Sequence, residues 1–444
     1  MLAISYLILA LILFFAVLSL DATIYMKLML GLLLGLSPLF LYKPIYFLFF
    51  IFLITPSLRD ISETIIVGNF NNISFNFNFV IDLMVLAFGG IFLLRNIKPT
   101  IELIKKYKVI TLFFLFLITS ALSVIYSIDK TSSAIELSRI IIIFILFIYS
   151  ILAVKNKNNF YQLIAAILFG SLFPCLISFY QYFTVSGWWD KTIMAYRVDG
   201  TFSHPATLAF YLISTLPIIY ALLSNKINKS KKIPLAVLLL LNLFIALITL
   251  TRGAWIGLLA MSLVFGLFKS RKFLVAITAL IFLAYLFTPA INERVNDVFN
   301  PKYNSSLITR LKIIETTLPA FTNAPVLGYG LGSFKNINLK YNDEAKTYES
   351  LQAHNDYLRL LIELGIIGLA IYISIFISLF ILIYKLYKTD SKYIRNYLFS
   401  LIILWLGILA ISLGDNILRT MPLQFLIWSY TGAVIAYANL KEVS

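Results

Sequence analysis

Residues 362–386 read IELGIIGLAIYISIFISLFILIYKL, with no charged side chain between Glu363 and Lys385. A run of this length can cross a bilayer as a helix, since one crossing takes about 20 apolar residues. Comparable runs recur through the chain. We identify about 14, at approximately 3–20, 26–42, 44–56, 77–94, 109–126, 139–154, 160–183, 205–224, 233–249, 253–268, 273–288, 362–386, 396–413 and 422–440. Because the run at 44–56 is short and it or a neighbour could be re-entrant, we expect about 12 to 14 spans.

The composition leads to the same fold class. Of the 444 residues, 61% are hydrophobic and 13% are charged, and the mean hydropathy is +0.92. Soluble domains are about half apolar and about one quarter charged, and they rarely expose large apolar patches. We therefore predict an all-α polytopic integral membrane protein. The composition excludes a soluble enzyme, a disordered chain and a nucleic-acid-binding domain.

The distribution of charge predicts the orientation. If the N-terminus lies inside, the inner loops hold 20 Lys and Arg against 3 acidic residues, and the rest of the chain holds 16 against 17. Lys and Arg accumulate in cytoplasmic loops, so we expect both termini in the cytoplasm. The net charge of +16 then lies near anionic lipid headgroups and needs no nucleic acid as a partner.

The longer polar segments fall on the outer side. We divide the chain into a transmembrane bundle at 1–288, an outer loop domain at 289–361 and C-terminal transmembrane helices at 362–444. Within the loop, 305–322 is predicted to form a helix, because apolar residues recur at helical spacing after a Ser that can cap it.

The spans are nearly free of charge, and the charges that touch the membrane lie at outer helix ends. Transporters usually place ionisable residues in the middle of the membrane, so this pattern favours chemistry at the outer interface. The chain has two histidines, His204 and His354, and one cysteine, Cys175, which we interpret as a small buried hydrophobe. These counts exclude a multi-histidine metal cluster and an intramolecular disulfide.

Two arginines stand just before outer span ends. Arg197 lies in YRVDGTFSHP, residues 196–205, and Arg252 lies in TRGAW, residues 251–255, where two apolar runs meet in a tight hairpin. An interfacial Arg can bind a phosphate with two parallel hydrogen bonds. The alternatives are a loop-shaping Arg197–Asp199 contact and a simple interfacial anchor for Arg252.

A third arginine, Arg310, lies in the predicted loop helix with Lys312. From this pattern alone, a solvated helix face is the favoured interpretation, and anion binding is the alternative.

His354 lies where the large loop enters a span, in the stretch QAHNDYLR at 352–359. Asn355 or Asp356 can cap the new helix, which places His354 at its N-terminal end. Imidazole is the side chain best suited to proton transfer near neutral pH, although a lone histidine is more often structural.

Gly328, Gly330 and Gly332 resemble a phosphate loop, but they follow a helix and a Pro instead of a strand. We interpret them as a turn that returns the loop to the membrane, with backbone contacts to a substrate as the alternative. Asp82, Asp415 and Arg419 lie near outer helix ends, and an Asp415–Arg419 pair is the simpler explanation for the last two.

Taken together, the outer face offers two or three arginines and one histidine, with no acidic triad for a divalent metal. This set suits a membrane-embedded phosphate or diphosphate substrate. Arginines can stabilise a departing pyrophosphate, and a base can deprotonate an acceptor hydroxyl.

At these residues the chain resembles the O-antigen ligase/polymerase family. The matching pieces are the 197–205 motif, Thr251-Arg252-Gly253-Ala-Trp, Arg310, PVLGYGLGSF at 325–334, and His354-Asn-Asp-Tyr-Leu followed by ELGIIG at 363–368. Many relatives carry Asn after the Pro of the first motif, where this chain has Ala206, so a role for that Asn is not carried over and His204 is its substitute candidate.

The resemblance implies a C-type glycosyltransferase-like membrane fold in the bacterial inner membrane, with the active site on the periplasmic side. It implies that a glycan is transferred from undecaprenyl diphosphate without a metal or nucleotide cofactor. By position, Arg197, Arg252 and Arg310 would bind the diphosphate, and His354 would activate the acceptor hydroxyl. Asn355, Tyr357, Gly328 and Gly330 would have supporting roles.

Three reactions remain open within the family. A ligase transfers the finished polymer to lipid A-core, a polymerase transfers a growing chain to another lipid-linked repeat, and a third branch glycosylates proteins. We favour the ligase because the matches at 251–255 and 354–368 are closest to it. A transporter of lipid-linked glycans is the alternative from another class, and it predicts mid-membrane charges and inverted repeats.

Overall fold

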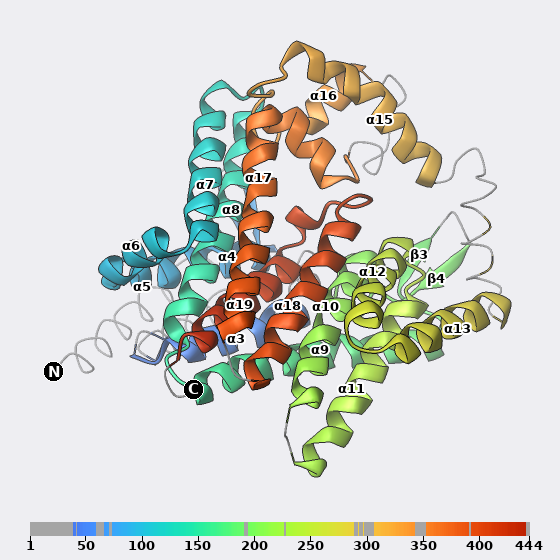
Figure 1. Ribbon diagram of the computed structural model, residues 1–444. Coiled ribbons are helices and arrows are strands. Elements are labelled where there is room, and N and C mark those ends of the chain that lie inside the picture. The colour runs from blue at the N-terminus through green and yellow to red at the C-terminus, as the bar shows by residue number, and fades with distance from the viewer. Residues whose placement is uncertain are drawn as a thin grey trace.

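The computed structural model describes residues 39–40, 42–58, 66–70, 73–190, 194–225, 228–287, 292, 296, 306–341, 352–389 and 392–440. The predicted span at 3–20, most of the one at 26–42 and parts of the 289–361 loop lie outside these residues. The described chain forms a bundle of long helices with two small antiparallel hairpins (Figure 1).

In chain order, the elements are α3 (Pro44–Leu58), β1 (Ile66–Phe70), β2 (Ile73–Asn76), α4 (Phe77–Met84), the π-helical η2 (Val85–Gly89), α5 (Gly90–Arg95), α6 (Ile97–Lys106), α7 (Lys108–Tyr126), α8 (Lys130–Ala153), α9 (Lys157–Thr184), β3 (Trp188–Asp190), β4 (Ala195–Arg197), α10 (Pro205–Ser224), α11 (Lys229–Ile248), α12 (Arg252–Phe268), α13 (Arg271–Phe287), α15 (Ser306–Asn323), α16 (Phe334–Tyr341), α17 (Asp356–Thr389), α18 (Lys392–Ile411), the 3₁₀ turn η4 (Ile417–Arg419) and α19 (Met421–Ala438).

Eight helices of the described residues are long and apolar enough to cross a membrane: Asn78–Arg95, Lys108–Tyr126, Lys130–Ala153, Lys157–Thr184, Pro205–Ser224, Lys229–Ile248, Asp356–Lys388 and Ile394–Ile411. Each one overlaps a span predicted from the sequence. Two shorter apolar helices, Pro44–Ser57 and Arg252–Phe268, overlap two more. The all-α polytopic membrane fold is therefore confirmed, while the total number of spans and the three-part division stay predictions.

The core of the bundle is built around α19. All 18 of its residues are buried, because it packs against α8, α9, α10 and α18. Its polar side chains bond inside the bundle: the indole of Trp405 donates to Thr431 at 3.0 Å, and Gln424 donates to the Ile417 carbonyl at 2.9 Å. At Gly432 an added Cβ would lie 2.6 Å from the Phe147 carbonyl oxygen, so α8 and α19 pack with only a glycine between their backbones.

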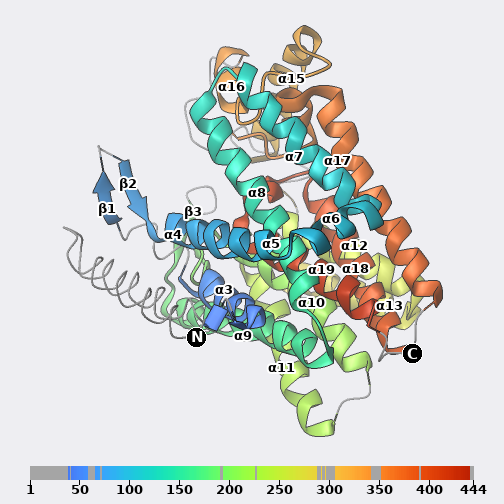
Figure 2. The same cartoon turned by 90° about the vertical axis from the view of Figure 1, so that its left-hand side faces the viewer.

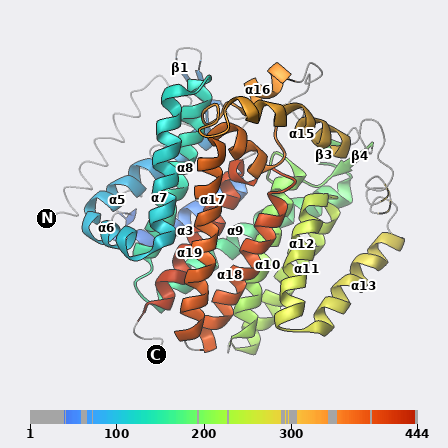
Figure 3. The ribbon, with the colours of Figure 1, turned by 45° about the horizontal axis from the view of Figure 1, so that its top comes forward.

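The bundle has a polar end and a basic end. Helices α10, α12 and α17 begin at one end, directly after the stretches that hold His204, Thr251 and His354. They run toward the opposite end, where α18 starts and the Lys-rich connections lie (Figure 3). At that basic end, the Asn396 amide bonds to Asn225 at 2.8 Å.

The described part of the large loop packs over the polar end. The predicted helix at 305–322 is α15, which forms a small core with α16 and the first turns of α17, around Ile313, Phe334 and Leu358. Both loop helices lie beyond the upper ends of α7 and α8 (Figure 2).

Within α17, Gly365 has φ 63° and ψ −165°, which separates a short leading segment from the long span. The positive φ favours glycine, and an added Cβ would lie 2.2 Å from the Val326 carbonyl oxygen. This break directs the residues before α17 across the polar end.

Candidate active site

A cavity of about 730 Å³ opens at the polar end of the bundle. Its lining comes from β3–β4, the start of α10, the α11–α12 turn, α15, the residues before α17 and the loop after α18. Arg197, Arg252, Arg310 and His354, which stand up to 157 positions apart in the sequence, all line it. The four stretches singled out in the sequence therefore share one cavity.

Arg197 is buried at the wall of this cavity and is held by protein partners. Its Nε donates to the Thr249 carbonyl at 2.7 Å, its Nη1 to Asp190 at 2.9 Å and its Nη2 to the Thr251 hydroxyl at 2.9 Å. The guanidinium also lies 5.6 Å from the Trp188 ring, across the β3–β4 hairpin. Two of its five N–H groups thus fix the turn between α11 and α12, and a third binds Asp190 in β3.

The ion-pair partner of Arg197 differs from the one considered in the sequence. Asp190 forms the pair, while Asp199 accepts a hydrogen bond from the Gln181 amide at 2.7 Å. The Arg197–Asp199 contact is therefore wrong as an account of this loop. Asp190 gave no signal in the sequence, because the hairpin that brings it to Arg197 consists of strands of three residues each.

Arg252 is the first residue of α12 and lies half-buried at the cavity wall. The adjacent Gly253 allows α12 to approach α10, since an added Cβ would lie 3.1 Å from the Phe210 ring. The helix N-terminus adds a partial positive charge beside the guanidinium. This corner of the cavity favours an anion.

Asp415 lies between Arg310 and His354. Its Oδ2 is 3.8 Å from Arg310 Nη2, and its Oδ1 is 3.9 Å from His354 Nδ1. Burial alone would raise the pKa of Asp415, but the neighbouring His354 imidazole and the charge of Arg310 hold this pKa below its usual value. Asp415 is therefore an ionised partner for the imidazole.

The segment that carries His354 is fixed to the loop after α18. Asn355 caps α17 by accepting from the Leu358 N–H at 3.0 Å, as predicted, and Asp356 accepts from the Leu418 N–H at 3.0 Å. The Asp356 N–H donates to the Ser412 carbonyl at 3.0 Å. His354 itself has a φ of 45°, a left-handed conformation that costs a side-chain-bearing residue energy and recurs at functional sites.

His204 has a different role from His354. Its Nδ1 accepts from the Ala206 N–H at 3.1 Å, which caps α10, and its ring packs edge-on against Trp188. Burial, together with the charge of Arg197, lowers the pKa of His204 to about 4. The ring is therefore neutral near pH 7, with one nitrogen already used in the cap.

A buried ion cluster beneath the cavity was missed in the sequence. Glu136 of α8 accepts hydrogen bonds from Arg359 Nη1 at 3.4 Å and from Arg139 Nη1 at 2.5 Å, and it forms an ion pair with Arg419 Nε at 2.9 Å. The expected Asp415–Arg419 pair is therefore wrong, because Glu136 holds Arg419. The signal was the spacing of three between Glu136 and Arg139. The predicted span at 139–154 began at Arg139 and left Glu136 outside the helix, whereas α8 begins at Lys130.

The supporting residues lie outside the cavity lining. Gly328 and Gly330 have φ values of 69° and 93° and form the turn expected from the sequence, and the Gly330 N–H donates to the Glu363 carbonyl at 2.8 Å. The Tyr357 hydroxyl donates to the Leu409 carbonyl at 3.0 Å. These contacts fix α17 against its neighbours.

Within the described ranges, no group of three or more His, Cys, Asp or Glu side chains is placed to hold a metal ion. The cavity instead gathers guanidinium groups, one imidazole that lies 3.9 Å from Asp415, and a helix N-terminus. Such a lining can bind a phosphate-bearing molecule and move one proton.

The comparisons with known proteins reach the same region. Residues 235–373, from α11 through His354 into α17, match the family model described as O-antigen ligase. A protein of Rickettsia conorii, whose name describes it as a polysaccharide ligase, is 28% identical over 257 residues. That match covers 54% of this chain and 58% of the relative, so the chain spans little more than half the length of the relative. The resemblance to the O-antigen ligase family is confirmed.

Proposed function

Since the chain is O-antigen ligase-like over residues 235–373, we propose that it transfers a glycan from undecaprenyl diphosphate to lipid A-core at the periplasmic face of the bacterial inner membrane. The bond from the anomeric carbon of the sugar to the diphosphate oxygen breaks, and a bond from that carbon to an acceptor hydroxyl oxygen forms. Undecaprenyl diphosphate leaves with the bonding electron pair, and the hydroxyl proton passes to His354.

The donor diphosphate binds beside Arg252 and Arg310. Both line the cavity, and the α12 N-terminus adds a partial positive charge next to Arg252. Their positive charges stabilise the leaving diphosphate more than the bound ester, because negative charge develops as the glycosidic bond breaks. Arg197 holds the α11–α12 turn that presents Arg252.

His354 is the general base, and Asp415 positions it. A proton on Nδ1 directed at Asp415 leaves Nε2 as the basic nitrogen for the acceptor hydroxyl. When His354 takes the proton, the negative charge of Asp415 stabilises the imidazolium. We expect the separation of 3.9 Å to shorten when the substrates bind, because catalytic hydrogen bonds tighten in the complex with substrate.

The observation that carries this proposal is the assembly of Arg252, Arg310, His354 and Asp415 around one cavity at the end of the bundle opposite the basic loops. A channel for transport would need polar groups along the bundle between its two ends. The Glu136 cluster, which lies beneath the cavity, is held in mutual ion pairs.

The test uses purified protein in liposomes with an undecaprenyl-diphosphate-linked glycan, with and without lipid A-core. Glycan on lipid A-core, formed only when that acceptor is supplied, is the expected product. Longer lipid-linked chains made without the acceptor would replace the ligase by a polymerase, and glycan transfer only to an added protein would indicate a protein O-oligosaccharyltransferase. Movement of the donor across the bilayer without transfer would favour a transporter.

His354→Ala tests the assignment of the base. Transfer is expected to fall by at least about 100-fold, while binding of the donor stays within about twofold, because the base acts on the acceptor. His204→Asn is the control, since His204 lines the same cavity but caps α10. Normal turnover by His354→Ala would rule out this assignment.

A further inference from the structure

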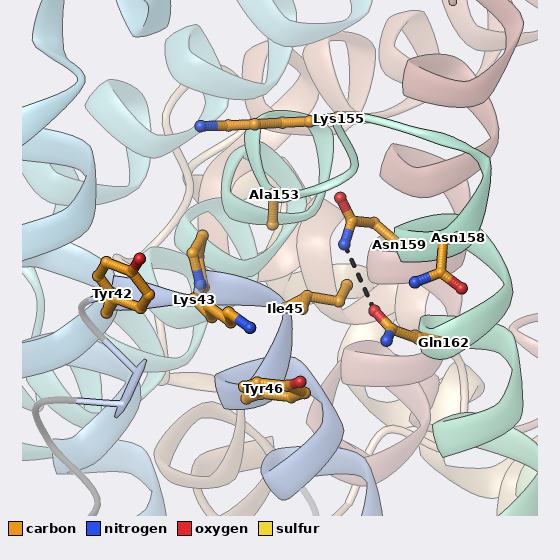
Figure 4. Close-up of a pocket in the computed structure, with 10 residues that line it drawn as sticks. Tyr42, Lys43, Ile45, Tyr46, Ala153, Lys155, Asn158, Asn159 and Gln162 are labelled. Atoms are coloured by element: carbon orange, nitrogen blue, oxygen red, sulfur yellow. Dashed lines mark hydrogen bonds between the residues drawn. The ribbon is translucent and has the colours of Figure 1, made fainter.

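A second cavity, of about 310 Å³, lies at the basic end of the bundle, far along the helices from the candidate active site. It is formed where α3 begins, α8 ends and α9 begins. Figure 4 shows Lys155 across one end of this space, Tyr46 across the other, Lys43 between them, and the amides of Asn159 and Gln162 on the facing side.

The lining of this cavity is rich in hydrogen-bond donors and positive charge. Lys43 and Lys155 bring two ammonium groups, and the lining residues that the structure describes include no carboxylate. Asn158, Asn159 and Gln162 add amide groups. The N-termini of two helices, α3 at Pro44 and α9 at Lys157, add partial positive charge. A phosphate group is the ligand that this combination favours.

The walls of the cavity are held in place by the fold. The Tyr149 hydroxyl of α8 donates to the Pro44 carbonyl at 3.0 Å, which fixes the start of α3. Asn156 caps α9 by accepting from the Asn159 N–H at 2.8 Å, and the Asn159 amide donates to Gln162 at 3.4 Å. The lysines therefore extend from a formed site and not from a free loop.

The cavity is placed to meet a lipid headgroup. Tyr42 is 80% exposed and Tyr46 is half-buried beside it, the arrangement of aromatic residues at a membrane–water interface. The Lys43 ammonium lies 5.6 Å from the Tyr46 ring centroid. A volume of about 310 Å³ accommodates a headgroup but not a whole lipid, whose chains would lie along the apolar helix surfaces outside.

We propose that this cavity binds the phosphate headgroup of an anionic membrane phospholipid, at the opposite membrane surface from the candidate active site. Lys43 and Lys155 bind the phosphate oxygens, and the amides bind the remaining polar groups of the headgroup. This site is separate from the glycan transfer reaction, so a binding measurement without donor or acceptor tests it alone.

The experiment is native mass spectrometry of the full chain in detergent, with added phosphatidylglycerol or phosphatidylcholine, and with soluble glycerol 3-phosphate as a competitor. The wild-type chain is expected to bind phosphatidylglycerol in preference to phosphatidylcholine. The double variant K43Q/K155Q is expected to bind phosphatidylglycerol about 30-fold more weakly, since each lysine near an anionic lipid surface contributes severalfold. The variant K43R/K155R is expected to restore binding, which separates charge from folding.

The matched control is K269Q/K388Q, which removes two lysines from the same end but away from the cavity. Equal loss in this control would reduce the effect to general surface charge and overturn the proposal. Unchanged phosphatidylglycerol binding by K43Q/K155Q would also overturn it. If glycerol 3-phosphate displaces the lipid at comparable concentration, the ligand is a soluble phosphate ester and the lipid assignment is wrong.

Discussion

Replacing Asp415 by Asn removes the negative charge between Arg310 and His354 while keeping the size of the side chain. In the structure this carboxylate lies 3.9 Å from His354 Nδ1 and 3.8 Å from Arg310 Nη2. Its side chain is 22% exposed, so solvent screens it in part. The substitution therefore separates two effects, on the base and on the phosphate-binding arginine.

The size of the first effect follows from Coulomb's law. A unit charge pair about 4 Å apart interacts with about 4 kcal/mol at an effective dielectric constant of about 20, and with about 1 kcal/mol in water. For this partly exposed pair we take about 2 to 3 kcal/mol, lost when His354 carries the proton in the transition state. This corresponds to a decrease in kcat of about 30- to 150-fold.

The assay is steady-state transfer from the lipid-linked donor, with kcat and the donor KM measured separately. Because Asp415→Asn also frees Arg310 from its carboxylate partner, the donor KM is expected to stay the same or to fall. Asp199→Asn is the matched control, since Asp199 bonds to Gln181 and does not line the cavity.

Two results would refute the reasoning. An unchanged kcat in Asp415→Asn would mean that the carboxylate does not act on the base. A raised donor KM with an unchanged kcat would mean that Asp415 serves substrate binding alone. Equal losses in Asp199→Asn would point to a general effect on folding.

Three further substitutions are expected to give distinct outcomes. Arg252→Lys should lower kcat/KM by at least about 10-fold, because an ammonium lacks the planar fork for phosphate, and an unchanged value would make Arg252 an interfacial anchor. His204→Asn should leave the shape of the pH–rate profile unchanged, because burial and Arg197 lower the pKa of His204 to about 4 and keep it neutral throughout the neutral range; a displaced acid limb would contradict this. Glu136→Gln should destabilise the chain by about 3 to 5 kcal/mol, since Arg359 and Arg419 lose a buried counter-ion, and thermal unfolding in detergent that matches wild type would refute it.

The fold class could be predicted from the sequence because hydropathy is a local property. Runs such as 362–386 need no knowledge of their neighbours to be identified as spans. The break at Gly365 could not be predicted in this way, because it depends on a contact with a distant part of the chain. The Val326 carbonyl approaches so closely that only a glycine fits there. The sequence pattern gave the span but not the change of direction that precedes it.

The positively charged residues and the histidine of the candidate site could be predicted from the sequence, but the acidic residues that pair with them could not. Arginine and histidine beside outer span ends are visible in the sequence, because interfacial charge is rare enough to notice. The sequence analysis missed Asp190 and Glu136 and gave Asp415 the wrong partner. The pairs of Asp415 and Glu136 join elements that are distant in the chain, and the pair between Asp190 and Arg197 depends on a short hairpin. Which side chains form ion pairs is decided when the helices assemble, and no periodic pattern in the sequence indicates it.

The four arginines among the lining residues of this cavity differ in the contacts that hold them. Arg197 and Arg419 have close carboxylate partners, Asp190 at 2.9 Å and Glu136 at 2.9 Å, which hold each guanidinium in place. Arg310 faces Asp415 at the longer distance of 3.8 Å, and Arg252 stands at a helix N-terminus. A diphosphate competes more easily with a long, partly solvated contact than with a short buried one, because the short pair must be desolvated and broken. The donor is therefore expected to depend most on Arg252 and Arg310, with Arg197 and Arg419 supporting the walls against which it binds.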